Sequence, residues 1–317
     1  MKKLVSLVLI AVMVLACFAG CGAKATTWTV TCPWAESGVA SMVSQKAAAK
    51  SVDYSEDTVL VAQAIKGDAA TVNTWCMDTK ANDPELVFVG EGLLSITSEI
   101  DPAKMQFDYS DFVFVENLYS SVFVLSADAK LGLENLADLE AYVAAGNEIS
   151  VACNGATGSE AFLAAALFGS MGADLKIVPY TSAGEAAQAV SKGETMFAVS
   201  HQSQILEASQ QGNVNVIAAF DESAIEDGVF AGVEGVGEHG YPYFRNRCFI
   251  MARKGTDAAK IAGLKDLYGK ILNDAEVSSW LADTMLLEVD TMSEADVQAH
   301  IDNVRSIVIA YKDVVTG

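Results

Sequence analysis

The chain has 317 residues, of which 41 are acidic and 20 are basic, for a formal net charge of −21 at pH 7. Hydrophobic residues make up 51% and charged residues 19%, which is typical of a packed globular protein and excludes intrinsic disorder. The length predicts two domains or one large one. The sequence shows no basic face that could bind phosphates, so we expect no nucleic-acid partner.

The first residues form the pattern of an export signal. A basic "MKK" precedes 13 apolar residues, "LVSLVLIAVMVLA", a run too short to span a bilayer and of the right length for a signal peptide. Small residues follow, in a pattern that resembles a bacterial lipoprotein signal. We predict that residues 1–21 form the signal peptide and lipidation site, with Cys21 carrying the lipid and Cys17 as the alternative. An ordinary cleaved signal without lipid is the other interpretation.

Lipid chains would anchor the mature protein to the outer face of the bacterial cell membrane, or it would be periplasmic. No later apolar run is long enough to span a membrane. The remaining cysteines are far apart and form no C-x-x-C, so we predict no metal site. Disulfides are one possibility for these residues, but buried free thiols are the simpler interpretation for Cys32, Cys76, Cys153 and Cys248.

Strand-like and helix-like segments alternate along the chain. Strands are predicted at 28–32, 58–64, 85–90, 112–126, 148–153, 175–180, 195–200, 214–220 and 247–253. Helices are predicted at 37–50, 67–81, 135–146, 159–171, 182–193, 201–212 and over much of 256–313. A polar loop is expected after residue 90. A core-facing stripe is predicted on the last helix, at Val297, Ile301, Val304, Val308 and Tyr311.

Alternating helices and apolar, β-branched strands predict parallel sheets that are covered on both faces. The elements are too many for one sheet of modest size. The long extended run at 112–126 and the late strand at 247–253 are natural crossovers between two lobes. We therefore predict an α/β fold with two doubly wound sheets joined by crossover strands. Lobe 1 would be discontinuous, at 25–118 plus 245–317, and lobe 2 would be inserted, at 119–244.

Ligands of open α/β sheets bind beyond the carboxyl ends of the strands, where helix N-termini offer unpaired N–H groups and a partial positive charge. An anion bound there needs no lysine, which matters in a chain as acidic as this one. The candidate loops are 32–41, 89–95, 153–161, 179–187 and 200–204.

The loop "CNGATGSEAF" at 153–162 shows this chemistry most clearly. It lacks the lysine of a nucleotide-binding P-loop and the G-x-G-x-x-G of a dinucleotide loop. What remains is a polar nest that suits a small carboxylate. The donors would be the amides of Ala156, Thr157 and Gly158 and the hydroxyls of Thr157 and Ser159. The alternative is that Asn154-Gly155 is only a tight turn and Ser159 only a helix cap.

Five segments in order resemble the extracytoplasmic receptors of bacterial tripartite tricarboxylate transporters. They are "VTCPWAESGVAS", "ELVFVGEG", "ACNGATGSE", "VPYTSAGEAAQAVSKG" and "VSHQSQILEASQQG". The family has a "VPF…GG…D" loop, a "YTLLxG" strand, an "SSGxGT" loop, a "VPYKG…A…L…G" segment and a strand leading to "PS…" at these places. The resemblance covers essentially the whole mature chain. It implies a two-lobed periplasmic-binding-protein fold of type II that closes on a small organic acid.

The resemblance also implies two walls of a ligand site. One wall would be Trp34, Glu36, Ser37, Gly38, Gly90 and Glu91. The other would be Asn154, Thr157, Thr181, Ser182, His201, Gln202 and Ser203, beside the nest residues Ala156, Gly158 and Ser159. Glu36 and Glu91 either bind an amine or hydroxyl on the ligand or are simply solvated. Trp34 either lines the ligand or packs at the hinge.

No catalytic triad, metal set or cofactor loop is visible, so we predict neither an enzyme nor a cofactor. Cys153 and His201 both lie at candidate site edges, but nothing around them resembles a nucleophile motif. A buried thiol and a ligand-contacting imidazole are the simpler interpretation. Arg245 and Arg247 flank the return crossover, where we predict inter-lobe salt bridges.

The sequence therefore predicts a monomeric solute-binding lipoprotein. It would capture a small organic carboxylate and deliver it to the membrane permease subunits of a tripartite transporter. One alternative is a sensory receptor of the same fold that feeds a membrane signalling protein, and another is a secreted α/β enzyme. Di- or tricarboxylates, aromatic acids, and amino acids and their derivatives all stay open as ligands.

Overall fold

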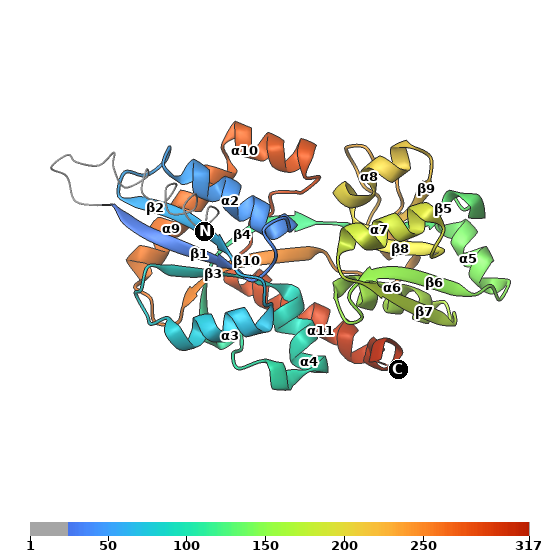
Figure 1. Cartoon of the computed structure of the whole chain (residues 1–317), viewed down its shortest axis with the longest axis horizontal. Coiled ribbons are helices and arrows are strands. Elements are labelled where there is room, and N and C mark those ends of the chain that lie inside the picture. Colours follow the sequence, from blue (N-terminus) through green and yellow to red (C-terminus); the bar gives the residue numbers. More distant parts are fainter. Residues whose placement is uncertain (1–24, 317) are drawn as a thin grey trace, which may run out of the picture.

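The computed structural model describes residues 25–316, so the predicted signal peptide, Cys17 and Cys21 lie outside the described residues. The described chain forms two five-stranded sheets that lie side by side (Figure 1). The first sheet has the order β2-β1-β3-β10-β4, with β1 (Thr26–Cys32), β2 (Thr58–Ala64), β3 (Glu85–Gly90), β4 (Phe112–Ser121) and β10 (Asn246–Arg253). The second has the order β7-β6-β8-β5-β9, with β5 (Phe123–Asp128), β6 (Ile149–Asn154), β7 (Leu175–Tyr180), β8 (Phe197–His201) and β9 (Val214–Ala219).

Helices cover both sheets. Around the first sheet lie α2 (Val39–Ser51), α3 (Ala69–Asp78), the π-helical turn η1 (Gly92–Thr97), α4 (Ser98–Ile100), α9 (Ala258–Leu272), α10 (Ala275–Ser279) and the π-helical turn η6 (Trp280–Thr284). Around the second lie α5 (Leu136–Ala144), α6 (Ser159–Ser170), α7 (Ala183–Lys192) and α8 (Gln202–Gln210). The last helix is α11 (Glu294–Thr316). Short 3-10 turns complete the set at Pro102–Lys104, Tyr109–Asp111, Ala129–Leu131 and Val236–His239.

The two sheets share one topology, in which the fourth position is filled by the strand that follows a crossover. That strand is β10 in the first sheet and β5 in the second, and each is antiparallel to both of its neighbours. The prediction of parallel sheets is therefore wrong for one strand in each. A crossover strand enters its sheet from the other half of the molecule, so it runs antiparallel to the neighbouring strands of that sheet.

The chain passes between the sheets as one extended segment. Strand β4 ends at Ser121 and β5 begins at Phe123, within the run that was predicted to be a crossover (Figure 1). The return path leads from β9 through residues 220–245 into β10. These features confirm the predicted fold of two doubly wound sheets joined by crossover strands. The lobe boundaries at 118/119 and 244/245 stay predictions.

Helix α11 links the two halves a third time. Val297 and Ile301 pack into the hydrophobic cluster around β3 and β10, whereas Val304 and Val308 pack into the cluster beneath the second sheet. The hydroxyl of Tyr311 lies 2.8 Å from Ser170 Oγ at the end of α6. The predicted core-facing stripe is confirmed, and it serves two cores in turn. No helix among residues 25–316 combines the length and the apolar character needed to cross a membrane.

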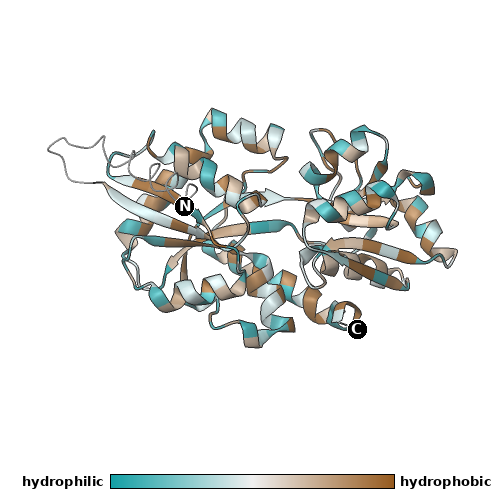
Figure 2. Cartoon of the chain, in the orientation of Figure 1, coloured by the Kyte–Doolittle hydropathy of each residue, from teal (hydrophilic) through white to brown (hydrophobic). Residues whose placement is uncertain are grey.

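Apolar residues concentrate on the strands and on the inward faces of the helices (Figure 2). The four cysteines of the described chain are buried and free, which confirms the prediction of unpaired thiols. Burial raises the pKa of Cys153 and Cys248 well above the ordinary value of a thiol. These thiols are therefore packing residues without nucleophilic character.

Candidate functional site

The strand registers bring the predicted loops to shared sheet edges. In the second sheet Asn154 pairs with Tyr180, and the N–H of Gly155 donates to the Tyr180 carbonyl at 3.0 Å. Strand β6 also pairs with β8, so the loops after β6, β7 and β8 leave from one edge. In the first sheet Thr31 pairs with Val87, which places the loop after β1 beside the end of β3.

Glu91 connects the edges of the two sheets. It follows β3 directly and its side chain is fully buried. Its carboxylate accepts hydrogen bonds from the side-chain amide of Asn246 (2.9 and 3.2 Å), from the backbone N–H of Arg247 (2.9 Å) and from the hydroxyl of Ser159 (3.1 Å). Ser159 is the first residue of α6, which packs on the second sheet. The loops at 90–92 and 154–159 therefore meet across the two halves, and the interpretation of Glu91 as a solvated residue is wrong.

Burial raises the pKa of Glu91, and the hydrogen bonds from Arg247, Asn246 and Ser159 offset part of that effect. The carboxylate is saturated with donors from the protein. Glu36, in contrast, is exposed on the loop after β1. Of the two acids predicted in this region, only Glu36 is open to a ligand.

Glycines allow the close approach of these loops. A Cβ added at Gly90 would lie 3.4 Å from the ring of Trp34, which is half-buried and packs edge-on against Phe88. A Cβ at Gly158 would lie only 2.8 Å from the carbonyl oxygen of Asn154. Gly155 has φ of +78°, a conformation that side chains rarely adopt. Trp34 therefore packs on β3, and its contact with a ligand stays a prediction.

The helices that start at this junction lack side-chain caps. Helices α2, α6 and α8 follow Gly38, Gly158 and His201, and none of these three residues caps its helix with a side chain. In α6 the N–H of Glu160 is engaged by the carboxylate of the same residue. The outlying helices α5, α9 and α10 are capped in the usual way by Asn135, Asp257 and Asp274. The uncapped starts keep unpaired donors and a partial positive charge for an anion.

The start of α7 is organised differently. Ser182 Oγ accepts from the N–H of Glu185 at 3.2 Å, and Thr181 donates to the Glu185 carboxylate through its N–H (3.1 Å) and its hydroxyl (2.7 Å). Both residues are exposed but already engaged. They lie at the predicted edge, and their part in binding stays a prediction.

His201 is a neutral polar group at the end of β8. Its Nδ1 lies 2.7 Å from Ser121 Oγ, and its ring centroid lies 4.5 Å from that of Phe123, with the two rings tilted by 35°. Burial lowers the pKa of His201 to about 4, so the imidazole carries no charge at neutral pH. Cys153 lies 3.9 Å from the carbonyl of Val151, and no hydrogen bond joins it to His201 among residues 25–316. The geometry does not form a Cys–His nucleophile pair.

Glu160, the second residue of α6, was not among the site residues predicted from the sequence. Its side chain is 5% exposed, and no other residue of the described chain donates a hydrogen bond or an ion pair to it. Burial, together with the charge of nearby Glu91, raises the pKa of Glu160 to about 7. A hydrogen bond from its own backbone N–H offsets part of this rise. The signal in the sequence was an acid inside the apolar run "SEAFLAAALF".

The arginines of the return crossover are occupied by acids. The guanidinium of Arg245 binds Asp221 after β9 (3.1 and 2.5 Å) and also pairs with Glu288, which bridges to β4 at Ser120. This confirms the predicted inter-lobe salt bridge for Arg245. The prediction is wrong for Arg247, whose guanidinium binds Asp290 (2.9 and 2.6 Å) just before α11.

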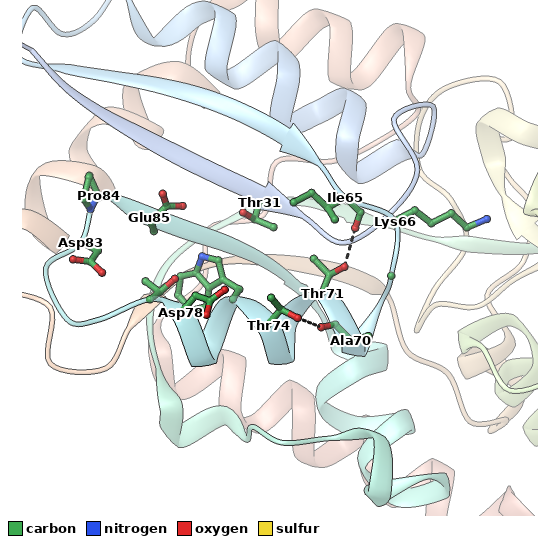
Figure 3. A pocket seen from close by; sticks show the side chains of 13 residues that line it. Thr31, Ile65, Lys66, Ala70, Thr71, Thr74, Asp78, Asp83, Pro84 and Glu85 are labelled. Atoms are coloured by element: carbon green, nitrogen blue, oxygen red, sulfur yellow. Dashed lines mark hydrogen bonds between the residues drawn. The ribbon is translucent and has the colours of Figure 1, made fainter. Parts of the chain in front are cut away.

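A cavity of about 630 Å³ lies elsewhere, between α3, Thr31 of β1, the loop after β2 and the start of β3 (Figure 3). None of the predicted ligand-binding residues lines it; its walls include Thr31, Ile65, Thr71, Trp75, Asp83 and Glu85. Within residues 25–316 no three His, Cys, Asp or Glu side chains gather in a way that could hold a metal ion.

The family model described as "Tripartite tricarboxylate transporter family receptor" matches residues 58–307. The chain belongs to this family. The match runs from β2 into α11 and includes the loops at 89–95, 153–161, 179–187 and 200–204. The loop after β1 lies before its first residue. A search of curated protein sequences finds no match to this receptor.

Solved structures of the same kind resemble this receptor. A protein of R. palustris solved with adipate has a TM-score of 0.77 at 14% identity, over 92% of this chain and 98% of its own. MatC from Rhodopseudomonas palustris with bound malate has a TM-score of 0.69 at 20% identity, over 91% of this chain and 98% of its own. A TctC solute binding protein from Polaromonas, without ligand, has a TM-score of 0.73 at 14% identity, over 90% of this chain and 98% of its own. At these identities the likeness shows the fold alone, and it confirms the periplasmic-binding-protein architecture of type II.

Replacing Glu91 with alanine should destabilise the receptor. The change leaves the amide of Asn246, the N–H of Arg247 and the hydroxyl of Ser159 without their acceptor in a buried place. We expect the free energy of unfolding, measured by urea denaturation, to fall by about 3 kcal/mol. The exposed Glu36→Ala change should alter it by less than about 0.5 kcal/mol. Equal effects of the two changes would contradict the role given to Glu91.

Replacing Glu160 with glutamine should remove a pH dependence of stability. The pKa of Glu160 is about 7 in the folded protein against an ordinary 4.5, so its stabilising contribution is complete below pH 4.5 and is lost as the pH rises through 7. Relative to Glu160→Gln, the wild type should lose about 3 kcal/mol of unfolding free energy between pH 4.5 and pH 8. Denaturation curves of both proteins across this range measure the difference. A constant difference would show that Glu160 does not titrate there.

Proposed function

We propose that this receptor is an extracytoplasmic solute-binding lipoprotein that captures a small organic carboxylate between its two halves. It delivers the ligand to the membrane permease subunits of a tripartite tricarboxylate-type transporter. The family match and the shared fold support this function. So do the related structures that were solved with adipate and with malate.

The observation that carries the proposal is the set of uncapped helix starts at α2, α6 and α8. The contact between Glu91 and Ser159 holds the start of α6 beside the edge of the first sheet. A ligand carboxylate would accept hydrogen bonds from the amides of the nest and from the hydroxyl of Thr157, which is exposed and within reach of a ligand. The hydroxyl of Ser159 already donates its one proton to Glu91, so Ser159 would contribute its backbone N–H at the start of α6. The anion is bound by peptide dipoles in place of a cationic side chain.

Ligand contacts on both halves give a reason for the two-lobed architecture. The halves are joined by the extended β4–β5 segment, by the return into β10 and by α11. Closure about these connections would bring the Trp34–Gly38 loop and the nest onto one ligand, as in other hinged receptors. The membrane subunits could then distinguish loaded from empty receptor. The receptor acts as a monomer and carries out no chemical step.

Anchoring at the outer face of the cell membrane would come from lipid on Cys21, with Cys17 as the alternative. A soluble body on a lipid anchor stays close to the membrane subunits while both halves remain mobile in solvent.

A thermal-shift screen of the purified protein against small acids tests this function. A carboxylate present at 100 times its Kd should add about 2.7 kcal/mol of stability. The change Gly158→Ala, whose new Cβ would press on the Asn154 carbonyl at 2.8 Å, should weaken the binding roughly tenfold.

The matched control is Gly263→Ala in α9, where an added Cβ meets nothing within 4 Å. It should bind like the wild type. If no di-, tri- or aromatic carboxylate and no amino acid stabilises the protein, the proposed function is wrong. Unchanged binding by Gly158→Ala would place the ligand away from the nest.

A further inference from the structure

Glu160 lies at the place proposed for the ligand. It is the second residue of α6, and the residue before this helix, Gly158, has no side chain to cap it. Its carboxylate accepts a hydrogen bond from its own N–H, and a Cβ added at Gly158 would lie 3.2 Å from its Oε2. The carboxyl group therefore lies against the 154–158 loop. When ionised, it uses the same partial positive charge that a bound anion would use.

The groups around Glu160 do not neutralise it. Glu91, which follows β3 of the first sheet, binds Ser159, the residue before Glu160, and its charge raises the pKa of Glu160. The thiol of Cys153 on β6 lies close enough to Glu160 for the carboxylate charge to raise the pKa of the thiol. On α11, which packs on α6, Arg305 is engaged by Glu99 and by the Leu94 carbonyl.

The remaining charged and polar groups near this junction have partners of their own. Arg247 of β10 binds Asp290, and Arg245 binds Asp221. His201 of β8 is bonded to Ser121 and is neutral at physiological pH. Glu91 and Glu160 therefore form a buried acidic pair without a cation among the described residues.

A ligand carboxylate would be the third anion at this junction. Close negative charges at a dry site cannot all stay ionised, and the least costly relief is for one carboxyl group to take up a proton. Glu91 is poorly suited, because its four hydrogen bonds all come from donors that favour the ionised form. Protonation of Glu160 would weaken only one hydrogen bond, the one from its own backbone N–H.

We propose that carboxylate binding is coupled to the uptake of one proton by Glu160, and that the neutral carboxyl group then donates a hydrogen bond to the bound anion. The proton comes from solvent, and no covalent bond to carbon changes. This inference rests on the proposed function and adds to it the protonation state in which the ligand is held. Glu160 is then a specificity residue, because an anionic ligand is favoured only when the carboxyl group of Glu160 is protonated.

The coupling has a quantitative consequence. Burial and Glu91 place the pKa of Glu160 at about 7 before any ligand arrives, so the binding-competent protonated form is abundant at neutral pH and scarce above it. The apparent Kd is the intrinsic Kd divided by the competent fraction. It should rise about tenfold for each pH unit well above 7.

The test measures the Kd of malate and adipate by isothermal titration calorimetry at pH 6.5 and pH 8.5, where both ligands are largely ionised. The wild type should bind roughly 20-fold more weakly at the higher pH, because fewer molecules carry the proton. Glu160→Gln, which is neutral and can donate an N–H at every pH, should change less than about twofold. The matched control Glu148→Gln, at an exposed residue just before β6, should follow the wild type.

A second readout counts protons directly. In buffers of different ionisation enthalpy at pH 7, the wild type should take up about half a proton per ligand and Glu160→Gln about none. The same pH dependence in both proteins would overturn the proton coupling and leave the proposed function intact. If neither acid binds to either protein at pH 6.5, and no other carboxylate or amino acid of the thermal-shift screen stabilises them while both melt cooperatively, the proposed function fails and the coupling fails with it.

Discussion

A single buried carboxylate holds the candidate site together. Glu91 accepts hydrogen bonds from Asn246, from Arg247 and from Ser159, which belong to segments far apart in sequence. A buried charge is tolerated only where donors surround it, so the end of β3, the start of β10 and the start of α6 are constrained to meet. The position of the nest beside the first sheet and the proximity of Glu160 to Glu91 follow from that meeting.

The fold was largely predictable because its strands are short apolar runs between polar segments. The predicted strands 85–90 and 175–180 coincide with β3 and β7. Strand direction was not predictable in the same way, because a strand buried on both faces has the same composition whether it runs parallel or antiparallel. The segment 92–97 was expected to be a polar loop, yet it forms a π-helical turn with Leu93, Leu94 and Ile96 buried. Its burial depends on α11, which comes some 200 residues later and packs against η1.

The candidate site was predictable only where a local pattern carried the chemistry. The nest and the start of α6 at residue 159 could be inferred from "CNGATGSEAF", because turn and capping preferences act over a few residues. Glu160 could not be evaluated in that way, since the meaning of an acid depends on which partners the fold brings to it. The same holds for Arg245 and Arg247, two residues apart in sequence, of which only Arg245 pairs with an acid that follows a strand of the second sheet, Asp221.

The acidic surface and the proposed anionic ligand are reconciled by local dipoles. A net charge of −21 repels an approaching carboxylate at long range, but salt screens that repulsion over about 10 Å, whereas peptide N–H groups act at contact distance. The most direct test is a ¹⁵N-resolved NMR titration of the purified protein with a carboxylate that stabilises it. The account predicts that the amide signals of Val39, Ser159 and Gln202, the first residues of α2, α6 and α8, are among the largest to move and that they saturate together. Shifts confined to the walls of the 630 Å³ cavity, with these three amides unmoved, would contradict it.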